Sequence, residues 1–136
     1  MQSSSAPPRL VLASASPRRR DLLQTMNIRF LVAPSQIDET PAQHEAPVLY
    51  VARMAASKAT AVAPRYPGFW ILGADTIVTL DGSIFGKPED AVGATKMLTA
   101  FSGRTHDVMT AISLINGCGK LAISFTVTTN VTFRDL

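Results

Sequence analysis

The segment that most restricts the fold is residues 10–20, where an apolar stretch passes through two serines and a proline into three consecutive arginines. Residues 9–13 are typical of a short strand, and Ser16 followed by Pro17 is a strong signal for a helix start. The chain should therefore open with a strand, a tight turn and a helix. Free N–H groups at a helix start attract anions, and nearby hydroxyl and guanidinium groups bind phosphate, so this turn is a candidate phosphate site.

A second interpretation of the same segment is the basic, solvated first turn of an ordinary surface helix. Cations at a helix start oppose the helix dipole, however, and a bound anion would explain the arginines at positions 18–20. From the segment alone, both interpretations stay open.

Length and composition narrow the class of protein. The 136 residues suffice for one domain with a core, and the net charge of +3 without a longer basic run favours a phosphorylated small molecule over polymeric nucleic acid. A single cysteine, Cys118, excludes an internal disulfide framework and a cysteine-based zinc site, and it suits a reducing compartment. We expect a cytoplasmic protein without a signal peptide or membrane-spanning segment, with a flexible leader at residues 1–8.

Helices and strands alternate in the first half of the chain. The pattern predicts a strand, helix and strand over residues 9–33, with the helix at 17–26 and the second strand at 28–33. Three prolines and no regular period predict an exposed loop over residues 34–47. The next helix begins near Pro47, and its apolar stripe leaves Lys58 free to face a cleft.

Hairpins dominate the second half. An apolar strand over residues 69–74 should stop at Asp75, a hairpin should turn at Asp81-Gly82, and a helix should cover residues 89–100. Two long β segments follow. We expect an α/β fold with a mixed, twisted sheet and flanking helices in one domain over residues 9–136. Because nothing closes the sheet after the last strand, we expect this domain to be C-terminally incomplete, with exposed apolar strand faces.

Two carboxylates are candidates for chemistry. Asp75 is expected at the carboxyl end of a buried strand, where open α/β sheets usually bind ligands, although an aspartate can also simply cap a turn there. Glu39 in the proline-rich loop is a plausible second ligand for a hard cation, or a solvated side chain. Magnesium prefers one or two carboxylates together with substrate phosphates and waters, so this pair would suffice.

Cations on separate segments suit the charge of a triphosphate if they converge on one pocket with Asp75. Each of them also has an ordinary surface interpretation. The sequence contains no Walker A motif, no G-x-G-x-x-G fingerprint and no G-x-S-x-G elbow, which argues against those nucleotide-binding and hydrolase classes. The candidate cations are Arg18, Arg19, Lys58 and Lys87.

Six short motifs follow one another along the chain: Leu12-Ala13-Ser14-Ala15-Ser16-Pro17-Arg18-Arg19, Ile37-Asp38-Glu39, Ala55-Ala56-Ser57-Lys58-Ala59, Gly73-Ala74-Asp75-Thr76, Gly86-Lys87-Pro88 and residues 98–106. Together and in this order, they resemble the Maf family of nucleoside triphosphate pyrophosphatases. The resemblance spans residues 9–136 and implies a Maf/ITPase-like fold. Members of this family continue further, into a helix, a loop with a base-contacting glutamine and closing strands.

The resemblance implies a role for each matching residue. Asp75 would be the proton acceptor and a metal contact, and Glu39 the second metal carboxylate, for a divalent cation such as Mg²⁺ or Mn²⁺. Arg18 and Thr76 fall on the specificity positions of the family and match its dTTP- and UTP-preferring branch. The residues that would hold the phosphates are Ser14, Ser16, Arg19, Lys58 and Lys87.

The expected function is hydrolysis of dTTP or UTP to the nucleoside monophosphate and pyrophosphate. The alternative is a catalytically impaired nucleotide-binding or interaction module, because the phosphate-binding motifs are present while the base-contacting end is not. The expected partner is the nucleoside triphosphate, without polymeric nucleic acid or membrane. A homodimer is a further expectation, which the residues alone do not test.

Overall fold

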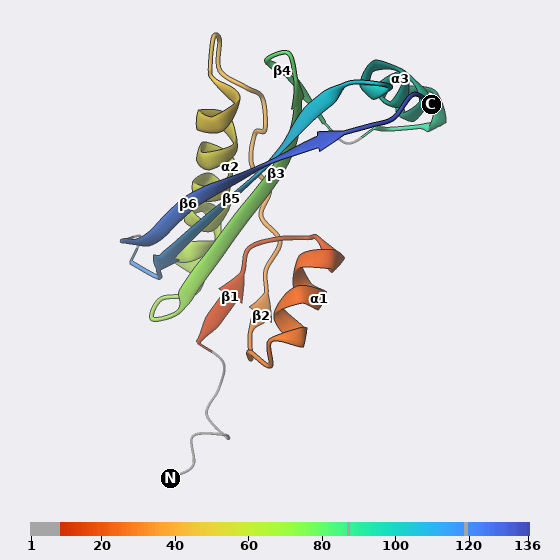
Figure 1. Ribbon diagram of the computed structural model, residues 1–136. Helices are drawn as coiled ribbons and strands as arrows, with labels where there is room; N and C mark the ends of the chain where they lie inside the picture. The colour runs from red at the N-terminus through yellow and green to blue at the C-terminus, as the bar shows by residue number, and fades with distance from the viewer. Residues whose placement is uncertain (1–8, 87, 119) are drawn as a thin grey trace.

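The computed structural model describes residues 9–86, 88–118 and 120–136. Its elements follow one another as strands and helices whose order matches the alternation expected from the sequence (Figure 1). In chain order they are β1 (Leu10–Leu12), α1 (Pro17–Thr25), β2 (Leu31–Val32), α2 (Pro47–Val62), a 3₁₀ turn (Ala63–Arg65), β3 (Trp70–Leu80), β4 (Ser83–Phe85), α3 (Ala91–Phe101), β5 (Thr105–Asn116) and β6 (Leu121–Thr132).

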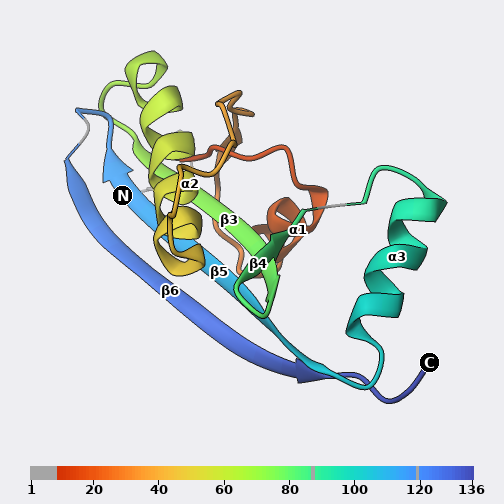
Figure 2. The same cartoon turned by 90° about the horizontal axis from the view of Figure 1, so that it is seen from above.

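The strands form one mixed six-stranded sheet in the order β2, β1, β3, β5 and β6, with β4 paired to the end of β3. The strands β2, β1 and β3 run parallel, whereas β5 and β6 are antiparallel to their neighbours. In Figure 2 the helix α3 lies apart from α1 and α2, beyond one end of the long strands. The mixed sheet with flanking helices confirms the predicted fold class.

Helix α2 packs closely on one face of the sheet because a glycine stands opposite it. A Cβ at Gly73 would lie 2.1 Å from the Ala55 carbonyl oxygen and 2.9 Å from the Ala59 nitrogen. The space beside Gly73 is therefore occupied by the backbone of α2. The core lies between α2 and the sheet in two clusters. They include Val11, Val62, Ile71 and Ile115 in one, and Tyr50, Val51, Met54, Ile77 and Ala111 in the other.

Alternate residues of β3 face the opposite side of the sheet, where α1 lies. Here Leu72, Ala74 and Thr76 are paired across to Leu114, Ile112 and Thr110 of β5. The same face continues into β6, where Ile123, Phe125 and Val127 are each about half exposed. The expected exposed apolar strand face is therefore present on β6.

Two strands have other bounds than the sequence predicted. The strand expected to stop at Asp75 continues to Leu80, because β5 pairs with β3 over ten successive positions. Asp75 thus lies in the middle of β3 and not at its carboxyl end. The strand expected over residues 28–33 shortens to Leu31–Val32, whereas Ser16 caps α1 and Asp81-Gly82 forms the hairpin turn as predicted.

Further predictions concern the leader, the domain bounds and the lack of membrane-spanning segments. Residues 1–8, predicted as a flexible leader, lie outside the described residues, and the domain bounds stay a prediction. Across the described part of the chain, no helix combines the length and apolar character needed to cross a membrane.

Candidate active site

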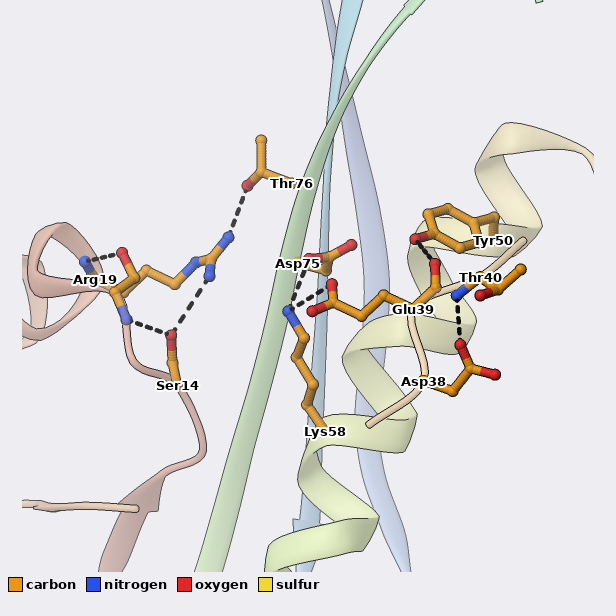
Figure 3. Close-up of polar contacts among 10 residues, drawn as sticks. Ser14, Arg19, Asp38, Glu39, Thr40, Tyr50, Lys58, Asp75 and Thr76 are labelled. Carbon is orange, nitrogen blue, oxygen red and sulfur yellow. Dashed lines mark hydrogen bonds and ion pairs between the residues drawn. The ribbon is translucent and has the colours of Figure 1, made fainter. Parts of the chain in front are cut away.

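The candidate site lies along one edge of β3. On this edge β1 pairs with β3 as far as Leu72, and β4 pairs from Val78 onward. Between these two positions, the described residues provide β3 with a strand partner only on its other edge, where β5 lies. Asp75 and Thr76 occupy this interval and, as successive strand residues, point to opposite faces of the sheet. The site therefore has two halves, one on each face (Figure 3).

The half on the α2 face consists of two carboxylates and a lysine. Lys58 Nζ, from α2, lies 2.9 Å from Asp75 Oδ1 and 3.7 Å from Glu39 Oε1. Asp75 is buried, and only 15% of the Lys58 side chain is exposed, so each charge depends on the other for compensation. The sequence placed Lys58 off the apolar stripe of its helix, and the structure confirms that it faces this site.

The donor set of this half suits a hard divalent cation. Asp75 and Glu39 come from different parts of the chain, yet both carboxylates lie close to the Lys58 ammonium group. The space between the two carboxylates is therefore favourable for a positive charge. Magnesium-type sites need one or two protein carboxylates, with phosphate oxygens and waters completing the shell. Among the described residues no cluster of three or more His, Cys, Asp or Glu side chains forms a complete protein cage. These residues fit a cation that is shared with a phosphorylated substrate.

The loop that carries Glu39 is anchored to α2 by a buried tyrosine. The Tyr50 hydroxyl donates a hydrogen bond to the Glu39 carbonyl oxygen at 2.5 Å. Burial raises the pKa of Tyr50, and the nearby carboxylates of Asp75 and Glu39 raise it further, so the hydroxyl keeps its proton. The sequence did not identify this residue. A tyrosine at a core position of a predicted helix is the signal that could have found it, because buried tyrosines usually bond through the hydroxyl.

A second anchor of the loop is a bidentate ion pair. Arg53, one turn after Tyr50, donates to both carboxylate oxygens of Glu45 at 2.7 and 2.8 Å and to the Thr40 carbonyl at 3.2 Å. The hydrogen bonds from Arg53, together with one from the Ala42 N–H, lower the pKa of Glu45 to about 2. The loop between β2 and α2 is therefore bonded to α2 at two points, Glu39 and Glu45.

The half on the α1 face is built from the serine and arginine turn. Ser14 Oγ accepts from the Ser16 N–H at 3.1 Å and from Arg19 Nη1 at 3.5 Å, and Ser16 Oγ caps the helix by accepting from the Arg19 N–H at 3.3 Å. Arg19 Nη2 donates to Thr76 Oγ1 at 2.9 Å. The residues of the predicted phosphate turn thus reach β3 directly, one residue from Asp75.

Two adjoining cavities accompany the two halves. One of about 780 Å³ lies between α1 and the sheet, and its polar lining includes Arg18, Arg19 and Thr76. The other, of about 400 Å³, contains Glu39 and Asp75. Thr76 lines both. The single pocket expected from the sequence is therefore a pair of cavities that meet at one residue of β3.

One predicted phosphate ligand, Lys87, lies outside the described residues. Its neighbours Gly86 and Pro88 line the smaller cavity together with Glu39 and Asp75. The sequence also missed Thr110, whose hydroxyl lies 3.0 Å from Thr76 Oγ1. A threonine in the middle of a strand carries no functional signal of its own, because threonine is common in strands.

With this geometry established, comparison with known proteins decides the family. The family model described as Maf-like protein matches residues 9–136. The chain belongs to the Maf family. The Maf relatives include a dTTP/UTP pyrophosphatase of Myxococcus xanthus, 54% identical over 127 residues that cover 93% of this chain and 63% of the relative. The protein of the same description from Geobacter sp. is 47% identical, with 93% and 66% covered. This Maf chain thus spans about two thirds of its relatives' length or slightly less.

Solved structures support the same fold at much lower identity. A nucleoside-triphosphatase / dITP/XTP pyrophosphatase from Mycobacterium abscessus superimposes with a TM-score of 0.59 at 14% identity, covering 90% of this Maf chain and 73% of that structure. The Staphylococcus aureus Ham1 protein gives 0.57 at 14% identity, with 89% and 69% covered. At this identity the likeness describes the fold alone, and it agrees with the mixed sheet and flanking helices predicted for the Maf chain.

Proposed function

We propose that this chain is a nucleoside triphosphate pyrophosphatase that hydrolyses dTTP or UTP to the monophosphate and pyrophosphate. The observation that carries the proposal is the convergence of Asp75, Glu39 and Lys58 one residue from the point where Arg19 reaches Thr76. A cation site and a guanidinium meet at one strand edge, as a polyphosphate requires. Several relatives that share this family are described as dTTP/UTP pyrophosphatases, which supports the same substrate class.

The binding roles follow the two halves of the site. Asp75 and Glu39 would hold Mg²⁺ or Mn²⁺, which when bound supplies positive charge to neutralise the phosphate oxygens. The phosphate chain would lie against the turn of Ser14 and Ser16, where hydroxyls, helix N–H groups and the Arg19 guanidinium are available. Lys58 would complete the phosphate contacts from the other face, and Lys87 stays a predicted phosphate ligand.

The chemical step is the attack of a water on the α-phosphorus. The water oxygen forms the new P–O bond while the bond from the α-phosphorus to the bridging oxygen breaks, and pyrophosphate leaves with that electron pair. Asp75 takes the proton of the attacking water, since its carboxylate is buried next to the phosphate site. Lys58 and Arg19 stabilise the negative charge that develops on the leaving pyrophosphate.

Base preference would be set on the α1 face. Arg18 and Thr76 line the larger cavity, which also offers apolar surface from α1 and the sheet. A largely apolar cavity with a few polar groups suits a nucleoside attached to a charged phosphate chain. We place the pyrimidine nucleoside in this cavity. The cytoplasmic location, the absence of polymeric nucleic acid and membrane partners, and the homodimer all stay predictions.

The test is turnover of dTTP and UTP with magnesium, with both products assayed. Asp75→Asn keeps the shape of the side chain and should lower kcat by about a hundredfold or more, because a positioned proton acceptor contributes that much. The matched control is Asp81→Asn, an exposed turn residue whose positive φ of 53° asparagine also adopts. Equal pyrophosphate release by Asp75→Asn and wild type would contradict the role of Asp75. Nucleotide binding without turnover by the wild type would favour the alternative of a binding module.

A further inference from the structure

Thr110 of β5 forms the far end of a hydrogen-bonded chain that begins in α1. It is paired directly across from Thr76 of β3, and the two hydroxyl oxygens lie 3.0 Å apart. Arg19 Nη2 lies 2.9 Å from the same Thr76 oxygen. The three side chains therefore link the helix that carries the arginines to two neighbouring strands, on the wall of the larger cavity.

The hydrogens in this chain are limited by the chemistry of its members. A guanidinium can only donate, so Thr76 Oγ1 must accept from Arg19. Each threonine hydroxyl has one hydrogen, and only one of these two hydrogens lies in the bond between the hydroxyls. If Thr76 donates to Thr110, its hydroxyl is fixed on both sides. If Thr110 donates, Thr76 accepts twice, and its oxygen is again fixed in place.

The orientation of Arg19 depends on this fixed oxygen. Among the described residues, the guanidinium also approaches Ser14 Oγ at the longer distance of 3.5 Å, so Thr76 provides the shorter contact. Thr76 itself is exposed on the strand, where its side chain would choose among rotamers without a partner. Thr110 supplies that partner from a strand which β3 and β6 hold on both edges.

We propose that Thr110 is a positioning residue for the phosphate-binding arginine. It holds the Thr76 hydroxyl, and the Thr76 hydroxyl in turn aims the Arg19 guanidinium across the edge of β3. This inference rests on the proposed function, in which Arg19 binds the phosphates. It assigns a role to a residue of β5, the strand whose Ile112 also lines the larger cavity.

The test compares two variants that separate the hydroxyl of Thr110 from its shape. Thr110→Val keeps the branched shape and removes the hydroxyl, while Thr110→Ser keeps the hydroxyl and removes the methyl group. We would measure the Kd for inorganic tripolyphosphate by calorimetry, kcat/KM for dTTP, and thermal unfolding. Valine suits a half-buried strand position, so the fold should persist. Thr110→Ala replaces the valine variant if that protein does not fold.

The expected result is a three- to tenfold rise in the Kd for tripolyphosphate in Thr110→Val, which corresponds to one neutral hydrogen bond. The value of kcat/KM should fall by a similar factor. Thr110→Ser should remain within twofold of wild type in both measurements. If the role of Thr110 were purely structural, Thr110→Val would lower the thermal midpoint, and Thr110→Ser would not restore the Kd and kcat/KM of the wild type.

The outcomes separate the inference from the proposed function. If the wild type binds tripolyphosphate but does not hydrolyse dTTP, the proposed function fails, and the Kd values of the variants still decide the role of Thr110. The inference is overturned if Thr110→Val binds tripolyphosphate as the wild type does, or if the serine variant is weakened as much as the valine variant. It is also overturned if the wild type does not bind tripolyphosphate.

Discussion

Replacing Gly73 by alanine tests how the site is assembled. The added Cβ would lie 2.1 Å from the Ala55 carbonyl oxygen and 2.9 Å from the Ala59 nitrogen, against ordinary contacts of 3.4 Å or more. Both neighbours are helix backbone, so no flexible side chain can turn away. Either α2 or β3 must move by about 1 Å. Overpacking of this kind costs about 1 to 3 kcal/mol, and backbone on both sides places Gly73→Ala at the upper end.

The same displacement should disturb the chemistry. Lys58 and Gly73 lie on the two elements that would be forced apart, and Lys58 Nζ lies only 2.9 Å from Asp75. We expect Gly73→Ala to lose about 3 kcal/mol of unfolding free energy, seen as a thermal midpoint roughly 10 °C lower, together with reduced pyrophosphate release. Urea unfolding followed by circular dichroism measures the first effect, and the product assay measures the second.

The matched control for this experiment is Gly86→Ala. A Cβ at Gly86 meets no atom within 4 Å, and its φ lies outside the left-handed region. This variant should keep the stability of the wild type within about 0.5 kcal/mol, as expected for an unstrained surface substitution. If Gly73→Ala were as stable as Gly86→Ala, the close approach of α2 to β3 would be refuted, together with our account of how Lys58 is placed.

Two further predictions concern the loop that carries Glu39. Tyr50→Phe removes the hydroxyl that bonds the Glu39 carbonyl, so it should lower the unfolding free energy by about 1 kcal/mol and weaken Mn²⁺ binding in a relaxation titration; unchanged values in both would contradict the anchor. Glu45 has its pKa lowered from 4.5 to about 2, so its pair with Arg53 stabilises the fold above pH 4.5 and fades as the pH falls toward 2. The difference in urea midpoint between wild type and Glu45→Gln should therefore be full at pH 7 and shrink below pH 4.5, and a difference independent of pH would refute the pairing.

The parts of the fold that local chemistry decides were predictable from the sequence. Ser16 and Pro17 define the start of α1 because capping and ring geometry act within a few residues. Asp81 and Gly82 define the hairpin for the same reason, since both adopt positive φ values of 53° and 80°. The resemblance to the Maf family correctly gave the fold class, because motif order reports on the whole chain.

The parts that depend on distant partners were not predictable in this way. β3 continues through Asp75 and Thr76 because β5 pairs with it, and a polar pair in an apolar run looks locally like the end of a strand. Val48 of α2 is apolar and yet 44% exposed, since the face that meets the sheet includes Tyr50 and Met54. Thr110 became visible only when its partner across the strands was known.

The placement of Asp75 and Thr76 on consecutive residues has a consequence for how the two faces cooperate. A single peptide unit joins the carboxylate that faces Lys58 to the hydroxyl that receives Arg19, within a strand paired along its other edge. The spacing between the two functional groups is therefore set by the covalent geometry of two consecutive strand residues. An insertion or deletion of one residue just before this pair would carry each group to the wrong side, whereas movements of the loops would leave their separation unaltered.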